Sequence, residues 1–211
     1  MSELTDELQY ILNWLKSTNV EFFDCYNPGL TRQQIDEITK DLPFKLSEEV
    51  YELYQWRNGT ADLGYNNGYL PLYFLFPEQL RADVICSFCS LQDSVYIYKS
   101  IGEATNYDDD YWKRKWFPIA AYENKRMLYV IGDLDPSPVY LWDVGCLEDS
   151  VRTYKNLISM ISVIAECCEF GLYQLIPHED AYEDGEEDDM IIRIDEEKLE
   201  LEKEIYRKYN S

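Results

Sequence analysis

Three short apolar runs between residues 116 and 143 constrain the fold of this chain more than any other feature. They are Trp116–Tyr122, Met127–Asp133 and Val139–Asp143, and tight-turn residues separate them. Aromatic and β-branched side chains along the runs favour strands. The middle run is apolar at every position from Met127 to Ile131, which predicts a central strand covered on both faces. No set of catalytic polar residues accompanies these strands, so they are more typical of a recognition sheet than of an active site.

Helical spacing of apolar residues predicts helices on both sides of these strands. Thr31, Ser47 and Ser150 stand where a side chain can cap a helix, while Asn58-Gly59 and Gly171 stand where helices can end. The predicted helices cover residues 4–16, 31–42, 47–58, 88–98 and 150–172, and one further strand is predicted at residues 70–76.

The charge of the chain limits its partners. The formal net charge is -22, and eight of the eleven residues from 179 to 189 are acidic. Such a surface repels nucleic acid and anionic membranes, and it accelerates encounter with a basic partner.

We expect residues 1–178 to form a single domain, and residues 179–211 to form an acidic linker plus a C-terminal helix. The N-terminal residues are acidic rather than basic, and residues 157–168 are too short and polar to span a bilayer, so a cytoplasmic protein is expected.

The cysteine and histidine content argues against a structural metal site or histidine-based catalysis. Cys86 and Cys89 have the CxxC spacing of redox and zinc sites, but a second CxxC is absent and His178 is the only histidine. Buried, inert cysteines are therefore expected, although a redox or metal role for Cys86 and Cys89 stays open. No nucleotide-binding or nucleophile-elbow motif is present. We expect no catalytic residues, no cofactor and no metal.

Two acidic clusters have compositions that could bind a hard cation. They are Asp108–Asp110 and the Asp133–Asp135 turn, whereas the run from Asp180 fails the EF-hand pattern because Ile191 replaces the bidentate glutamate. We interpret these clusters as solvated loops or as charge that faces a partner.

Tyrosine and tryptophan are unusually frequent, with 19 and 5 residues. Both types are favoured at interfaces because they combine a large rigid body with one polar tip. Filling of the core is the alternative, which we favour for Trp116, Tyr129 and Trp142. A surface role is favoured beside the acidic triplet. The candidate partner contacts are Tyr107, Asp108, Asp109, Asp110, Tyr111 and Trp112, with Glu183, Asp184, Glu186 and Glu187 as a second electrostatic group.

The order of several short motifs resembles the SUKH superfamily, which contains fungal cell-wall synthesis regulators and bacterial toxin-immunity proteins. The motifs are Leu42-Pro43, Asn58-Gly59, Trp116–Ala120, the strand ending at Asp133, and Val139-Tyr140 before a long helix. The resemblance covers residues 28–172. It implies an α+β fold in which helices flank a mostly antiparallel sheet. It also implies no cofactor, no catalytic residues and a protein-binding function, most often neutralisation of a toxin domain by direct contact.

Three functions follow from these observations. The first is an immunity protein whose acidic, aromatic face covers a basic toxin, for example a nuclease. The second is a scaffold or regulatory protein of signalling or cell-envelope synthesis, which would have several weak partners. The third, which fits least well, is a metal-dependent or acid–base hydrolase that uses the acidic loops.

Overall fold

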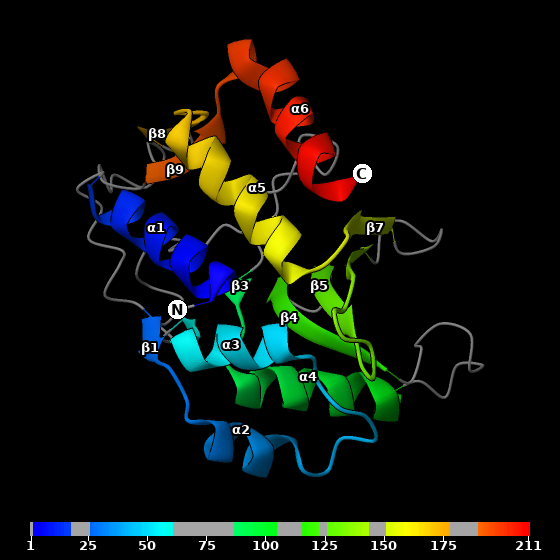
Figure 1. The fold of residues 1–211 in the computed structure, drawn as a ribbon. Helices are drawn as coiled ribbons and strands as arrows, with labels where there is room; N and C mark the ends of the chain where they lie inside the picture. The colour runs from blue at the N-terminus through cyan, green and yellow to red at the C-terminus, as the bar shows by residue number, and fades with distance from the viewer. Residues whose placement is uncertain are drawn as a thin grey trace, which may run out of the picture.

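The computed structural model describes residues 2–17, 26–60, 87–104, 115–122, 126–143, 151–177 and 190–211. Within these residues the chain has an α+β fold, in which helices pack around antiparallel sheets (Figure 1). This confirms the predicted fold class. In chain order the elements are α1 (Glu3–Ser17), β1 (Tyr26–Pro28), α2 (Arg32–Thr39), α3 (Glu48–Trp56), β2 (Arg57–Thr60), β3 (Ser87–Phe88), α4 (Leu91–Ala104), β4 (Trp116–Tyr122), β5 (Arg126–Ile131), β6 (Val139–Asp143), β7 (Val151–Tyr154), α5 (Leu157–Glu169), β8 (Tyr173–Pro177), β9 (Met190–Ile194), the 3-10 turn η4 (Glu196–Lys198) and α6 (Leu199–Asn210).

The three runs that dominate the sequence form the middle of the main sheet. Its strand order is β3-β4-β5-β6-β7, and every neighbouring pair is antiparallel. Strand β5 is central, and its residues from Met127 to Val130 are all buried, as the uninterrupted apolar run predicts. Two smaller antiparallel pairs, β1-β2 and β8-β9, lie outside this sheet.

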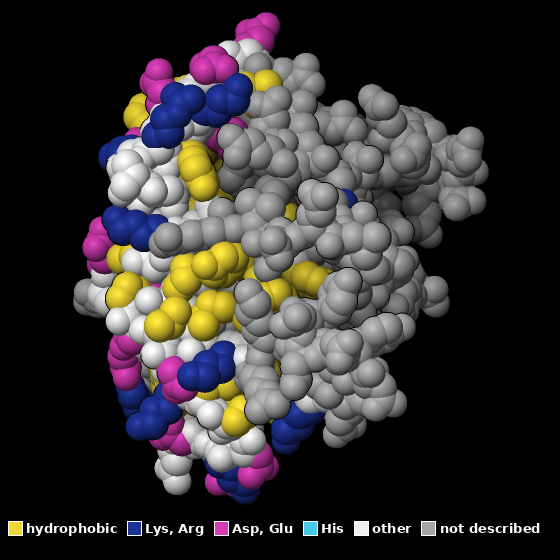
Figure 2. Space-filling view, turned by 90° about the vertical axis from the view of Figure 1, so that its right-hand side faces the viewer, with side chains coloured by type: hydrophobic (Ala, Val, Ile, Leu, Met, Phe, Trp, Pro, Cys, Tyr) yellow, Lys and Arg dark blue, Asp and Glu magenta, His cyan; other side chains and the backbone are white. Residues whose placement is uncertain are grey.

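The two faces of the sheet are packed differently. Leu128 and Val130 point into the main core with the buried residues of α1, α3 and α5. On the other face, Tyr129 stacks between Trp116 and Tyr140, with ring centroids 4.3 and 5.5 Å apart. Figure 2 shows hydrophobic side chains gathered at the height of the strands, with charged side chains above and below them. The sheet is therefore apolar on both faces and acts as the rigid centre of the fold.

Helix α5 is the most deeply buried helix of the described part of the chain. Ten of its residues are buried, including Ser159 and Ser162. Helices α1 and α6 pack against it from opposite sides, so segments from the two ends of the described chain meet across α5 (Figure 1).

The predicted linker at 179–189 lies outside the described residues, and the division of the chain at residue 178 stays a prediction.

The predicted helix starts are correct in two cases of three. Thr31 forms a full capping box with Gln34, which places the start of α2 as predicted. Ser47 is the residue before α3, but its buried hydroxyl makes no capping bond. The prediction for α5 is wrong. The helix starts after Asn156, whose side chain accepts a hydrogen bond from the Ser159 amide at 2.9 Å, and strand β7 intervenes after Ser150.

The predicted end of α3 is also wrong, because the helix ends at Trp56 and Asn58-Gly59 lie in strand β2. Gly59 has a φ of 71°, and a Cβ atom there would lie 2.3 Å from the backbone nitrogen of Ser90. This glycine therefore serves a close backbone approach instead of a helix end. The Asn58 side chain accepts a hydrogen bond from the Leu91 amide at 2.8 Å, which joins β2 to the start of α4.

Helical spacing correctly predicts α4, but Phe88 belongs to β3 and precedes the helix. The strand expected at residues 70–76 lies outside the described residues. None of the described helices combines the length and apolar character that crossing a bilayer requires.

Candidate partner-binding groove

The partner contacts expected from the sequence do not fall in the described part of the chain. Tyr107, Asp108, Asp109, Asp110, Tyr111 and Trp112 lie outside it, and so do Glu183, Asp184, Glu186 and Glu187. They stay predictions, and the groove that the structure describes is lined by other residues.

The described residues give no support to a metal or thiol site. No group of three or more metal-ligating side chains occurs among them. Asp133 forms an ion pair with Lys115 at 2.8 Å and accepts a hydrogen bond from the Lys45 amide, so it holds the 131–139 turn in place. Cys89, Cys167 and Cys168 are buried and form no disulfide, and burial raises the pKa of the Cys167 thiol to about 12 and also raises that of the Cys168 thiol. Cys167 and Cys168 are therefore protonated and unreactive at neutral pH, while Cys86 lies outside the described residues.

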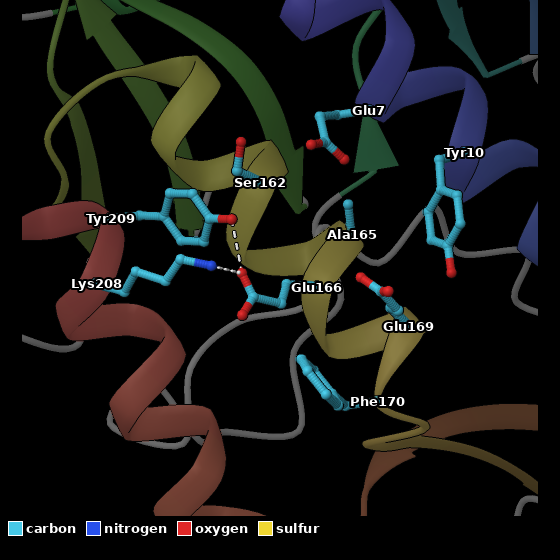
Figure 3. A pocket seen from close by; sticks show the side chains of 9 residues that line it. All are labelled: Glu7, Tyr10, Ser162, Ala165, Glu166, Glu169, Phe170, Lys208 and Tyr209. Carbon is cyan, nitrogen blue, oxygen red and sulfur yellow. Dashed lines mark hydrogen bonds and ion pairs between the residues drawn. The ribbon is translucent and has the colours of Figure 1, made fainter.

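A groove of about 350 Å³ lies over α5, between α1 and α6 (Figure 3). Its walls combine carboxylates, two exposed aromatic rings and one lysine. The lining residues are Glu7, Tyr10, Ser162, Ala165, Glu166, Glu169, Phe170, Lys208 and Tyr209.

Amphipathic packing of the three helices sets the walls of this groove. Helix α1 buries Leu4, Leu8, Ile11 and Leu12 in the core, and this leaves Glu7 facing α5 at the edge of the buried stripe. Helix α6 is anchored by Ile205, which is 3% exposed, so that Lys208 and Tyr209 one turn later reach α5. The Tyr206 hydroxyl also donates a hydrogen bond to the carbonyl of Thr153.

The α6 side of the groove is internally paired. Glu166 accepts hydrogen bonds from Lys208 Nζ at 2.5 Å and from the Tyr209 hydroxyl at 2.6 Å. Burial alone would raise the pKa of Glu166, but these two hydrogen bonds lower it below its ordinary value. Lys208 is the one cation among the residues known to line the groove, and Glu166 already engages it.

The α1 side of the groove has no such compensation. Neither Glu7 nor Glu169 makes a hydrogen bond or ion pair within the described structure. Burial raises the pKa of Glu7, and the neighbouring charges of Glu3, Glu169, Glu166 and Asp6 raise it further. Glu166 and Glu169 also stand in the last turn of α5, where the helix dipole disfavours negative charge. The negative charge of these carboxylates on the α1 side of the groove therefore lowers the stability of the folded chain.

The floor and rim of the groove offer contacts of two other kinds. Ser162 is only 3% exposed, lines the groove, and has no hydrogen-bond partner for its hydroxyl in the described part of the chain. Its oxygen is not fully enclosed, so the groove leaves it accessible to water or to a bound group. Tyr10 and Phe170 are 41% and 52% exposed, which leaves two aromatic rings available at the rim. The groove can thus bind a group that is cationic, donates hydrogen bonds and stacks on aromatic rings.

The described residues thus form an α+β domain with an acidic groove between α1 and α6. Residues 29–167 match the model of the SMI1 / KNR4 family (SUKH-1), and the chain belongs to this family. Membership fits an immunity-type or regulatory protein-binding role, in a family that is generally non-catalytic. A comparison with curated proteins found no match for the chain.

Most of the groove lies outside the part of the chain that matches the family. Glu7 and Tyr10 precede residue 29, whereas Glu169, Phe170 and α6 follow residue 167. Only Ser162, Ala165 and Glu166 of the lining belong to the matched region. Residues outside the matched part therefore contribute most of the groove lining.

The groove does not follow from the sequence patterns of the chain. The apolar stripe of α1 was predicted, but the stripe alone does not show which polar neighbour faces another helix. Ser162 and Glu166 interrupt the apolar stretch 157–168, and this is the available signal. Most other residues of α5 are buried, and a polar residue in such a helix needs a partner or a cavity.

Proposed function

We propose that this chain is a non-enzymatic protein-binding domain that recognises a basic partner and acts in the cytoplasm as an immunity protein. The observation that carries the proposal is the uncompensated negative charge of the groove, where Glu7 and Glu169 have no cationic partner in the described structure. The net charge of -22 extends the same preference over the whole chain. Family membership supports a role in protein binding.

The mechanism is occlusion of a basic surface. Long-range attraction between the acidic chain and a basic toxin accelerates encounter, and a small number of buried contacts then set the lifetime of the complex. A nuclease is the toxin class that this charge suits best, because a surface that grips phosphate is basic. The acidic and aromatic residues at 107–112 and the acids at 183–187 are proposed as further contacts outside the groove.

The test is complex formation with any toxin candidate that is encoded beside this gene. We expect a 1:1 complex whose association rate falls steeply as salt is raised from about 50 to 300 mM, because salt screens charges beyond about 10 Å. Charge reversal at Asp108–Asp110 should slow association, while dissociation should change less. An association rate that is independent of salt would contradict the electrostatic mechanism. Several weak partners in place of one tight partner would favour the scaffold function.

A further inference from the structure

The groove between α1 and α6 has the chemistry to receive one particular side chain. We propose that it binds a single arginine of the basic partner, with the guanidinium between Glu7 and Glu169 and above the Ser162 hydroxyl. This inference rests on the proposed function, because it assigns one contact within the complex with a basic partner.

The unpaired carboxylates of the groove favour binding of a cation from outside the chain. Glu7 and Glu169 repel each other, and no described cation pairs with either of them. Lys208 is held by Glu166 and lies over the Tyr209 ring, with its ammonium 4.7 Å from the ring centroid. A bound cation would remove the repulsion between the two carboxylates, so part of its binding energy comes from relief of a strain already present in the free chain.

The other lining residues select arginine over lysine. A guanidinium is planar, carries five donors in a fixed fork and can bind two carboxylates and a hydroxyl at once, whereas an ammonium has three donors and no plane. Its flat face also stacks on aromatic rings such as the exposed Tyr10 and Phe170. The unpartnered Ser162 hydroxyl supplies an acceptor on the floor, in a position that no described side chain uses.

The size of the groove limits the occupant to a side chain. Its volume of about 350 Å³ falls at the small end of the range of roughly 300–1,000 Å³ that is typical of ligand pockets. A helix or strand of the partner does not fit into this space, but one long side chain with a few waters does. The rest of the partner must then lie across α1 and α6, whose outer surfaces carry further carboxylates such as Glu3, Asp6 and Glu204.

The first experiment titrates the full chain with N-acetyl-arginine N-methylamide and follows amide chemical shifts by NMR. Neutral N-acetyl-citrulline N-methylamide and the corresponding lysine derivative are the matched probes. We expect saturable shifts in α1 near Glu7 and in α5 from Ser162 to Phe170, weaker binding of the lysine probe and none of the citrulline probe. Shifts that are absent from these residues, or that are equal for arginine and citrulline, would overturn the proposal.

The second experiment uses the double variant Glu7→Gln with Glu169→Gln. The control, Glu197→Gln with Glu204→Gln, removes the same charge from exposed positions outside the groove. We expect the groove variant to bind the arginine probe and the basic partner about tenfold more weakly or worse, and the control to change either affinity by less than about twofold. The groove variant should melt no lower than the parent chain, which separates lost binding from lost folding.

The two proposals fail in different ways. A salt-dependent complex whose affinity is the same in the groove variant and the control would remove the arginine site and leave the proposed function intact. If the chain forms no complex with a basic partner, the proposed function falls, and with it the assignment of the groove to that partner.

Discussion

The two ends of α5 carry acidic and amide side chains that are used in opposite ways. At the N-terminal end, Asn156 caps the helix, and the Glu49 carboxylate accepts hydrogen bonds from the Leu157 and Ile158 amides at 3.3 and 3.4 Å. At the C-terminal end, Glu166 and Glu169 face the negative end of the helix dipole, and Glu169 lacks any partner in the described structure. The acid at the first end thus stabilises the helix, whereas at the second end Glu166 is paired with Lys208 and Tyr209 but Glu169 is not stabilised by any described contact.

This difference separates acids that hold the fold from acids that are free to bind. Burial raises the pKa of both Glu49 and Glu7, but backbone hydrogen bonds from Ile158 and Leu157 oppose the shift at Glu49. Glu7 has no such hydrogen bonds, and its carboxylate neighbours add to the shift. An acidic sequence alone does not distinguish the two cases. The distinction lies in whether donors from elsewhere in the fold meet the carboxylate.

The largest expected effect lies between the two ends, where α5 is anchored in the core. Ile161 is 1% exposed, and Ile161→Ala should lower the free energy of unfolding by about 2–5 kcal/mol because it leaves a cavity. Ile158→Ala, on the half-buried side of the same helix, is the matched control and should cost clearly less. Urea unfolding of both variants measures this. Equal losses would show that α5 is less well packed than its burial indicates.

A smaller loss is expected at the N-terminal end. Asn156→Ala removes the side chain that accepts the Ser159 amide, so the free energy of unfolding should fall by about 0.5–2 kcal/mol. Asn156→Asp keeps the acceptor and should restore most of this loss. If the alanine and aspartate variants unfold at the same urea concentration, the cap does not contribute and the contrast between the two ends is weaker than we describe.

The smallest effect is expected at the C-terminal end, and its sign is reversed. Glu169→Gln should raise the free energy of unfolding by a few tenths of a kcal/mol, because it removes negative charge from the last turn. It should also lower the pKa of Glu7, since Glu169 is one of the charges that raise it. Carboxyl carbon shifts during a pH titration measure the pKa directly. An unchanged Glu7 pKa would show that the two carboxylates do not interact.

The sign of the pH effect follows from the same shift. The pKa of Glu7 is raised in the folded chain above its ordinary value of 4.5. Its contribution therefore favours the folded state most below pH 4.5, and this advantage is lost as the pH rises through the raised value. The groups that face it are Glu3 and Asp6 on α1, Glu166 and Glu169 on α5, and Lys208 on α6. A cation binds to the ionised carboxylate. The affinity of the groove for a cation should therefore increase as the pH rises through the pKa of Glu7.

The fold was predictable because much of it is encoded locally. The aromatic and β-branched content of residues 116–143 predicts three strands of the main sheet, and Thr31, a residue that can cap a helix, marks the start of α2. The errors arise where distant contacts override a local signal. Gly59 fits a helix end by type, but its role is set by Ser90, about 30 residues away. Asn156 caps α5 in place of Ser150, because strand β7 extends the sheet beyond that serine.

The groove was not predictable from local patterns, because no single segment contains it. Glu7, Ser162 and Lys208 come from three helices that are far apart in the chain. A hydrophobic stripe predicts that each helix is buried on one side, but it does not predict which helices become neighbours. The contacts expected at 107–112 and 183–187 remain predictions based on composition.

The arrangement of α1 and α6 around α5 also sets the order of events during synthesis. The groove needs a wall from residues 3–17 and a wall from residues 199–210, so it cannot exist until the last helix has left the ribosome. The family-matched part, which ends at residue 167, is complete earlier. A chain that is still attached to the ribosome can thus have a formed main sheet without a formed groove, and the proposed arginine site is complete only once α6 packs against α5.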